Sequence, residues 1–482
     1  MSDEKKHVSI VVAGHVDAGK SSLTGRLLYD MGGIDERMMA KLNQKAQENG
    51  KPSFAFAYYM DNQKAEQERG ITIACNTKEF HTTKYHYTII DAPGHRDFIK
   101  NMITGSSQAD VALLLCPADG SSFLSSIAKG DHKTGEVPGQ TRNHARLLNL
   151  LGIKQLVVGI NKMDSEVEGV CYGEARYQEI ATEVRRILLQ EGWKKDQIES
   201  EIPIIPMSGF HGQNILKQAT EKMPWWKGVD IKISTTGGQC RVACLLDALN
   251  DMVNLPERDS TSAFRAPVGK VITSIKGIEC VITSRIEQGV VVKGEEVAFL
   301  PTHTASNPCV GKVFSIEMHH KEHPNAGPGD NVGISMKGLN KVNMPRDGDI
   351  MIKKSDTAFK ACETFVVQAM VLDHPNQIKP GYSPNCYVRT SHAACRLMEI
   401  DFKVGKKSTG GQKVSSPEFI EKGDMCQLVF KPTRPFVVDD FKTCEGLSRV
   451  AMLEGSVVCM IGKVVKVNFV SDDVAKAAKG KK

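Results

Sequence analysis

The chain has 482 residues, enough for about three domains of ordinary size. Hydrophobic residues make up 41% and charged residues 24%, close to the globular average, which excludes a mostly disordered chain. The net charge of +6 is a mild basic bias that permits an RNA partner without requiring one.

Targeting and cysteine patterns point to the cytoplasm. No apolar run approaches the roughly 18–20 residues that a membrane-spanning helix needs, and the charged start Met1–Lys6 does not resemble a secretory signal. The thirteen cysteines include no Cys-x-x-Cys pair and are typical of reduced thiols. We therefore expect a soluble cytoplasmic protein, monomeric and without a membrane partner.

Residues 1–256 alternate short apolar runs with helical stretches, which predicts a parallel α/β sheet. The runs are apolar throughout, as in strands of a sheet that is covered by helices on both faces. Helices are predicted at Tyr172–Glu191 and Gln239–Val253. The predicted strands are His7–Ala13, Tyr85–Ile90, Val111–Cys116, Leu156–Ile160 and Ile204–Met207.

A glycine-rich segment follows the first strand and matches the pattern G-x-x-x-x-G-K-[ST]. Its glycines let backbone N–H groups turn onto phosphate oxygens. Lys20 places a cation on the β- and γ-phosphates, and the hydroxyl of Ser21 suits Mg²⁺. The predicted phosphate-binding residues are Gly14, His15, Val16, Asp17, Ala18, Gly19, Lys20, Ser21 and Ser22.

The segment Asp91-Ala92-Pro93-Gly94-His95 follows the second predicted strand. The pattern D-x-x-G is weak by itself, because Asp30–Gly33 and Asp330–Gly333 also match it. Its place after a buried strand gives it weight. We expect Asp91 to hold Mg²⁺ through water and the N–H of Gly94 to contact the γ-phosphate, so that this loop senses hydrolysis.

Two further residues complete the predicted phosphate chemistry. Thr72, in Arg69–Ile73, is the candidate second hydroxyl ligand of Mg²⁺ in the triphosphate state. His95 is the candidate catalytic residue, because an imidazole one residue after Gly94 can orient a water in line with the γ-phosphate.

The base is predicted from Asn161-Lys162-Met163-Asp164, which ends the strand Leu156–Ile160. A carboxylate at Asp164 can accept hydrogen bonds from both N1–H and the exocyclic amine of guanine, whereas adenine offers no such pair of donors. The tripeptide Ser208-Gly209-Phe210 follows the strand Ile204–Met207 and is the second candidate base contact. The predicted ligands are therefore GTP and GDP with Mg²⁺.

Beyond Pro256 the helical periodicity largely disappears, and short strands alternate with Gly, Pro and Asn turns. The spacing predicts two β-barrels or sandwiches, at residues 257–356 and 357–470, followed by a Lys-rich tail at 471–482. The predicted strands are Val268–Thr273, Val281–Ile286, Val290–Val292, Val297–Leu300, Val310–Met318, Asn331–Lys337, Thr364–Leu372, Ala394–Val404, Gln427–Phe430, Pro435–Val438 and Val457–Phe469.

With these segments in order, the chain resembles the translational GTPases of the elongation factor one-alpha / Tu family over almost its whole length. The resemblance implies a P-loop GTPase domain followed by two β-barrels. It also implies ribosome-stimulated hydrolysis of GTP to GDP and phosphate, with aminoacyl-tRNA, the ribosome and a guanine-nucleotide exchange factor as partners. Further segments that carry it are Gly139–Arg142, Glu317–His320, Pro328–Gly333, Leu372–Ile378 and Thr390–Cys395.

Several segments depart from that family's usual pattern. They are the long stretch Asp119–Val137, the segment Gly277–Cys280 in place of a Gly-Thr pair, and Leu453–Ser456 in place of a segment with arginines. These departures resemble the divergent sister group called elongation factor-like protein. The resemblance also makes Lys403, Lys406, Lys407 and Arg449 candidate RNA-facing charges.

Three alternatives stay open. One is a GTPase of the same family that carries a protein cargo in termination or ribosome rescue, and another is the GTPase subunit of sulfate-activating enzymes. The third is a scaffold protein with a vestigial nucleotide site, although the intact set of site residues argues against degeneration.

Overall fold

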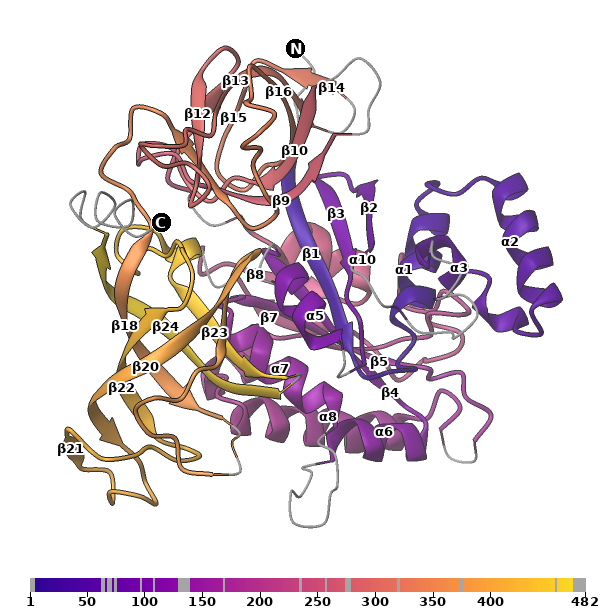
Figure 1. The fold of residues 1–482 in the computed structure, drawn as a ribbon. Helices are drawn as coiled ribbons and strands as arrows, with labels where there is room; N and C mark the ends of the chain where they lie inside the picture. The colour runs from indigo at the N-terminus through magenta and orange to yellow at the C-terminus, as the bar shows by residue number, and fades with distance from the viewer. Residues whose placement is uncertain are drawn as a thin grey trace. The chain divides into compact units, whose positions relative to one another are not determined.

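The computed structural model describes residues 5–470 except 62–65, 67–71, 73–75, 96–97, 107–108, 129–138, 168–169, 234–235, 256–257, 274–278, 319–320, 373, 375 and 456. The chain divides into two compact units, Met1–Pro256 and Glu257–Lys482 (Figure 1).

The first unit contains a six-stranded sheet in the order β2-β3-β1-β4-β5-β6. Five strands are parallel and β2 joins the edge antiparallel to β3, so the predicted α/β fold is confirmed. Nearly every residue of β1, β3, β4 and β5 is buried, as expected for strands with both faces covered. The strands are β1 (Lys6–Gly14), β2 (Asn76–His81), β3 (Tyr85–Asp91), β4 (Val111–Pro117), β5 (Gln155–Asn161) and β6 (Ile204–Pro206).

Helices connect the parallel strands and bring the loops after their carboxyl ends to one edge of the sheet. An insertion after α1 forms α2 (Glu36–Glu48), which lies apart from the sheet in Figure 1, a 3₁₀ turn Pro52–Phe54 and α3 (Ala57–Met60). Among the described residues, no helix has the length and apolar character needed to cross a membrane. The other helices are α1 (Lys20–Asp30), α5 (Ile99–Ser106), α6 (Gly120–Ile127), α7 (Gln140–Leu150), α8 (Glu174–Gln190) and α9 (Lys195–Ser200).

The helix predicted at Gln239–Val253 is wrong in its first half. Gln239–Val242 forms strand β8, antiparallel to β7 (Val229–Lys232), and helical structure is limited to α10 (Leu245–Asp247) and a π-helical turn at Ala248–Met252. The carboxylate of Asp247 accepts hydrogen bonds from the backbone N–H groups of Ala243 and Cys244 at 2.9 and 3.0 Å. This cap begins the helix at Leu245, so the apolar spacing across the segment joins two elements.

The first half of the second unit is a closed six-stranded barrel. Its strands follow the order β12-β17-β9-β10-β16-β13, and pairing of β12 with β13 closes the ring. The short strands β11 (Val291–Val292), β14 (Lys321–His323) and β15 (Asn325–Ala326) lie beside it. The barrel strands are β9 (Ala266–Ile272), β10 (Cys280–Arg285), β12 (Glu296–Leu300), β13 (Val310–Met318), β16 (Asn331–Lys337) and β17 (Ile350–Lys353).

A second six-stranded barrel follows and is closed by pairing of β19 with β20. The two barrels confirm the predicted fold class. The strand predicted at Pro435–Val438 is wrong: these residues form no ladder, although Phe436, Val437 and Val438 are buried in the core. Proline at 435 lacks the N–H that a ladder needs. The strands are β18 (Cys362–Val371), β19 (Asn385–Val388), β20 (Ser391–Val404), β21 (Lys413–Ser415), β22 (Met425–Pro432), β23 (Arg449–Glu454) and β24 (Val457–Phe469).

Two strands of the first barrel contribute to the cores of both barrels. On β12, Val297 and Phe299 belong to the first barrel's core, while the alternate residues Ala298 and Leu300 belong to the second. Strand β17 divides in the same way, with its central Met351 in the first core and its neighbours on either side in the second. Because successive side chains point to opposite faces, an unbroken apolar strand can serve two cores.

Charged pairs lie on the same seam, and one of them contains a buried arginine. Arg265 of the first barrel donates a 2.7 Å hydrogen bond to Asp356, and its guanidinium carbon lies 3.9 Å from the centroid of the Phe359 ring. The Arg265 side chain is only 5% exposed. A second pair joins Arg389 of the second barrel to Glu287 of the first at 2.7 Å. Arg265 also lies 3.9 Å from the carboxylate of Asp439 in the second barrel. Charged contacts thus join the two barrels at two places.

Replacing Arg265 by leucine is expected to lower the free energy of unfolding of the second unit by about 3–5 kcal/mol, because the buried Asp439 and the partly buried Asp356 would lose their cation. Differential scanning calorimetry of the full chain measures the change. The matched control is Arg241→Leu, whose exposed ion pair with Asp230 is expected to contribute about 0–1 kcal/mol. Equal stability of the Arg265 variant and the wild type would contradict this account of the seam.

Candidate functional site

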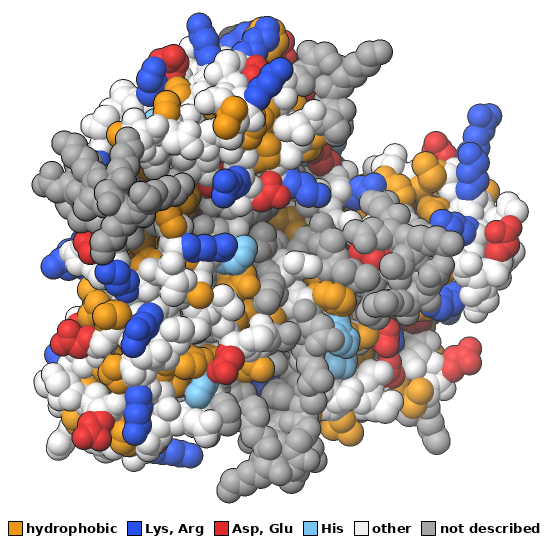
Figure 2. Space-filling view, viewed as in Figure 1, with side chains coloured by type: hydrophobic (Ala, Val, Ile, Leu, Met, Phe, Trp, Pro, Cys, Tyr) orange, Lys and Arg blue, Asp and Glu red, His pale blue; other side chains and the backbone are white. Residues whose placement is uncertain are grey.

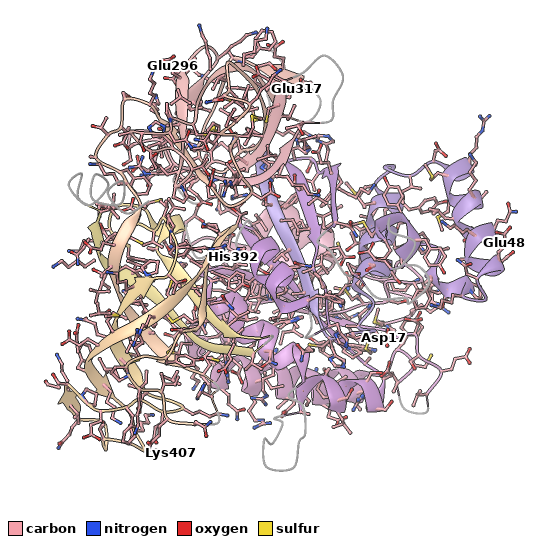
Figure 3. The ribbon with its side chains drawn as sticks, viewed as in Figure 1. Asp17, Glu48, Glu296, Glu317, His392 and Lys407 are labelled. Atoms are coloured by element: carbon pink, nitrogen blue, oxygen red, sulfur yellow. The ribbon has the colours of Figure 1, made fainter. Side chains whose placement is uncertain are left out.

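A cavity of about 670 Å³ lies in the first unit, at the loops that follow the carboxyl ends of the parallel strands. Asp17, labelled in Figure 3, belongs to the loop after β1. The volume is within the range of small-molecule sites. The predicted residues that line it are Val16, Asp17, Gly19, Lys20, Ser21, Ser22, Thr72, Gly94, His95, Asn161, Lys162, Asp164 and Phe210.

The remaining predicted residues lie in the same loops without lining the cavity. They are Gly14, His15, Ala18, Asp91, Ala92, Pro93, Met163, Ser208 and Gly209. The cavity also has walls that the sequence did not indicate: Ser53, Phe54, Ala57, Asp61, Asp119, Ser122 and Ser165.

The glycine-rich loop presents backbone donors to the cavity. Helix α1 begins at Lys20 after Gly19, which has a left-handed φ of 83°, and no side chain among the described residues caps it. The N–H groups of a helix's first turn have no partner within the helix, and they attract anions. Lys20 is almost fully buried and donates to the carbonyl of His15 at 2.8 Å, and burial lowers its pKa. An anion of phosphate type would offset that cost of burial.

The side-chain amide of Asn161 joins the phosphate loop to the loop after β6. Its Nδ2 donates to the carbonyl of Ala18 at 2.9 Å, and its Oδ1 accepts from the backbone N–H of Gly209 at 2.8 Å. A Cβ on Gly19 would lie 2.4 Å from the same Nδ2, so only glycine fits there. Asn161 therefore sets the spacing between the two loops.

Lys162 and Asp164 lie at the other end of the cavity. Lys162 has a φ of 64°, and its ammonium lies 3.3 Å from the carboxylate of Asp119, which also caps helix α6. Asp164 lines the cavity, 3.8 Å from Nε2 of His211. The carboxylate of Asp164 can thus bind the edge of a planar base, and the aliphatic stem of Lys162 can pack against its face.

Oxygen atoms of four residues gather near the phosphate loop. The hydroxyls of Ser21 and Thr72 lie 3.1 Å apart, and Thr72 donates to Asp61 at 3.1 Å. Both oxygens of Asp91 are fully buried, and the hydroxyl of Ser21 interacts with its carboxylate. Burial raises the pKa of Asp91 to about 6, and burial together with the charge of Asp91 raises that of Asp61 to about 7. Hydroxyl and carboxylate oxygens are the ligands that Mg²⁺ prefers, so these residues fit that ion.

The loop after β3 approaches the glycine-rich loop closely. A Cβ on Gly94 would lie 2.4 Å from the ammonium of Lys20 and 3.0 Å from the carbonyl of Gly14, so no larger residue fits without movement. His95 lines the cavity beside it, with its ring 5.9 Å from that of Phe98. The geometry brings a backbone N–H, a lysine and an imidazole to the same end of the cavity.

Sequence reasoning missed a histidine that supports the phosphate loop. Nδ1 of His144, on α7, accepts a 3.0 Å hydrogen bond from the N–H of Gly14. Burial lowers the pKa of His144 to about 3, so the ring remains a neutral acceptor. A single histidine within a helical pattern carries no signal of this role. Asp61 was missed for the same reason, as an isolated acid in a long insertion.

The candidate RNA-facing charges of the second unit divide into two groups. Lys403 is buried, lies 3.7 Å from the carboxylate of Asp424 and stacks over Phe419, so its prediction as a surface contact is wrong. Lys406 and Lys407 are exposed in the loop after β20, where Figure 3 labels Lys407. On the face shown in Figure 2, basic side chains are interspersed with acidic and polar ones.

Comparison with protein families gives three matches along the chain. The elongation factor Tu GTP-binding domain matches residues 5–255, elongation factor Tu domain 2 matches residues 279–352, and the GTP-eEF1A C-terminal domain-like family matches residues 364–465.

Similar curated proteins extend over the whole chain. Elongation factor 1-alpha of Entamoeba histolytica is 40% identical over 485 residues, covering 100% of both chains. Elongation factor 1-alpha of Methanosarcina mazei is 41% identical over 468 residues, covering 97% of this chain and 99% of the relative.

Solved structures share the fold at lower identity. The GTPase-like domain of Saccharomyces cerevisiae Ski7, bound to GTP, has a TM-score of 0.73 at 19% identity, with 96% of this chain and 97% of that chain covered. Translation elongation factor SelB of Methanococcus maripaludis has a TM-score of 0.61 at 19% identity, with 97% and 81% covered. The intact cavity and the full-length matches agree: the chain belongs to the elongation factor 1-alpha / Tu family of translational GTPases.

Proposed function

We propose that this GTPase binds aminoacyl-tRNA in its GTP form, delivers it to the ribosomal A site and releases it after hydrolysis. One observation carries the proposal. Thirteen of the predicted phosphate, base and metal residues line one cavity, in a chain that aligns end to end with elongation factor 1-alpha.

In this proposal the glycine-rich loop and Lys20 bind the phosphates, while Asp164 binds the guanine edge. The loop Ser208–Phe210 supports the base through the amide of Asn161. When bound, Mg²⁺ held by Ser21, Thr72 and Asp91 neutralises phosphate charge. Asp61 holds the hydroxyl of Thr72 and adds a second carboxylate beside that of Asp91.

His95 orients the attacking water in this proposal. Its ring lines the cavity one residue after Gly94, whose close approach to Lys20 fixes the loop next to the terminal phosphate. Positioning and charge neutralisation provide most of the catalysis in phosphoryl transfer. A correctly placed imidazole therefore suffices once the ribosome stabilises the loop.

We propose a separate function for each domain along the chain. Residues 1–256 bind and hydrolyse GTP in the cytoplasm, and the barrels at 257–356 and 357–470, with the tail at 471–482, engage tRNA and an exchange factor. We also propose that the chain belongs to the divergent elongation factor-like group. In support, its identity to elongation factor 1-alpha is as low for a eukaryotic relative, 40%, as for an archaeal one, 41%.

Protection of the aminoacyl ester tests delivery directly. Full chain loaded with a non-hydrolysable GTP analogue is expected to slow hydrolysis of the aminoacyl-tRNA ester, because an enclosed acceptor end is shielded from water. GDP-loaded protein is expected to give little protection. The measurement is the half-life of the ester with each nucleotide.

No protection in either state, with normal GTP binding, would contradict tRNA delivery. That result would favour a protein cargo of the kind carried in termination or ribosome rescue.

Asp164→Asn is expected to weaken GDP binding by about 100-fold, because two hydrogen bonds to a charged carboxylate are lost. The same variant is expected to bind XDP more tightly, because an amide N–H can donate to the C2 carbonyl of xanthine. Competition binding with GDP and XDP measures both effects. Equal losses for the two nucleotides would contradict the role of Asp164 in recognising the base.

His95→Ala is expected to reduce ribosome-stimulated GTP hydrolysis by roughly 100-fold or more while leaving nucleotide affinity nearly unchanged. Single-turnover hydrolysis on ribosomes provides the measurement, and His81→Ala, an exposed histidine of β2, provides the control. Retention of full stimulated hydrolysis by the His95 variant would overturn the assignment.

Asp61→Asn is expected to reduce Mg²⁺-dependent affinity for GTP about tenfold and to affect GDP less, since Thr72 is proposed to act in the triphosphate state. The amide oxygen still accepts from Thr72, so the variant removes charge while keeping shape. Titration of Mg²⁺ at fixed nucleotide measures the effect, with Asp196→Asn on α9 as control. An unchanged Mg²⁺ requirement would show that Asp61 has no part in the metal site.

A further inference from the structure

A second cavity of about 670 Å³ lies within the second unit, on the seam between the two barrels. One wall comes from the end of β12 and the loop that follows it, through Ala305. The opposite wall comes from the end of β22 and the residues after it, through Pro435, and the linker that includes Thr357 completes the cavity. The nucleotide cavity uses none of these residues.

The inner part of this cavity is apolar. Leu300, Ile352 and Phe359 line it, and all three belong to the shared core beneath the seam. Cys362 also lines it, with its thiol donating to the carbonyl of Phe436 at 3.2 Å. Burial raises the pKa of that thiol to about 12, so it contributes an apolar surface here and no nucleophile. A surface of this kind favours a ligand with an aliphatic body.

The rim of the cavity is cationic. Four basic side chains and two acidic ones line it, and one of the acids, Asp356, is already bonded to the buried Arg265. Lys354 forms an exposed pair with Glu296, which Figure 3 labels, at 2.9 Å. The basic residues are Lys354, Lys360, Lys431 and Arg434.

Lys431 is one of these cations, and its partner Glu363 also lines the cavity. Its ammonium lies 3.8 Å from Glu363, and both side chains are about half exposed. A long, solvated pair of this kind contributes little to stability. A ligand carboxylate can therefore replace Glu363 as the partner of Lys431 at small cost.

We propose that this cavity binds a small amphipathic carboxylate, with its alkyl chain against Leu300 and Phe359 and its carboxylate at the Lys431 rim. Such a ligand contacts both barrels and the linker between them, so its binding stabilises their joint arrangement. The site is separate from the proposed GTP-dependent function, and either proposal can fail without the other.

Isothermal titration calorimetry of the full chain loaded with GDP tests the site, with decanoate as the probe below its micelle concentration. Decanoate is expected to bind saturably and to raise the melting temperature of the second unit. 1-Decanol, which has the same chain length without the charge, is expected to bind more weakly.

Neighbouring positions in one loop provide matched variants. Ala305→Trp places a bulky ring in the cavity and is expected to weaken decanoate binding by roughly tenfold or more. Ser306→Trp adds the same ring at an exposed residue that does not line the cavity and is expected to bind as the wild type does. Lys431→Gln is expected to weaken decanoate binding by about two- to fivefold, against no change for the exposed Lys379→Gln.

Three results would overturn the proposal. The first is the absence of saturable decanoate binding. The same result is expected if the cavity binds a peptide segment instead. The second is an equal effect of the two tryptophan variants. The third is equal affinity for decanoate and 1-decanol, which would remove the role of the cationic rim.

Discussion

The side-chain amide of Asn161 sets the geometry on which the nucleotide site depends. It bonds the carbonyl of Ala18 and the N–H of Gly209, which lie 143 and 48 residues away along the chain. Asn161 ends a buried parallel strand, so its position is fixed by the sheet. The two loops that this amide joins therefore keep a constant separation. In the proposed function, this separation must match the length of the bound nucleotide.

Three charged residues of the nucleotide site are expected to interact with the phosphates and the metal. Lys20, Asp61 and Asp91 are buried charges whose pKa values are displaced by burial toward the neutral forms. Phosphates and a divalent cation would supply the missing partners of both signs. The site is thus electrostatically incomplete by itself, which couples the loops that carry Thr72 and Gly94 to the ligand's charge.

Much of this could be predicted from the sequence, because the signals are local. Each apolar run predicts one strand, and the motifs that contain Gly14, Lys20 and Asp164 each lie in the loop directly after such a strand. The edge strand β2 was not predicted, since its alternation includes Lys78 and Glu79 and shows only one buried residue. His144 and Asp61 act through contacts distant in sequence, and Lys403 was misplaced because composition does not reveal burial. The helix prediction for Gln239–Val253 failed because apolar residues of strand β8 and of the following helix happen to share helical spacing.

Because β12 and β17 contribute side chains to both cores, neither barrel has a complete hydrophobic core by itself. A fragment cut at the linker would carry a stripe made of Ala298, Leu300, Ile350 and Ile352 into water, or leave the second core without part of its cover. Exposed apolar surface of that kind promotes association between molecules. The two barrels are therefore expected to fold stably only together. A recombination event at the linker would leave each half insoluble, whereas one near Pro256 would separate two compact units.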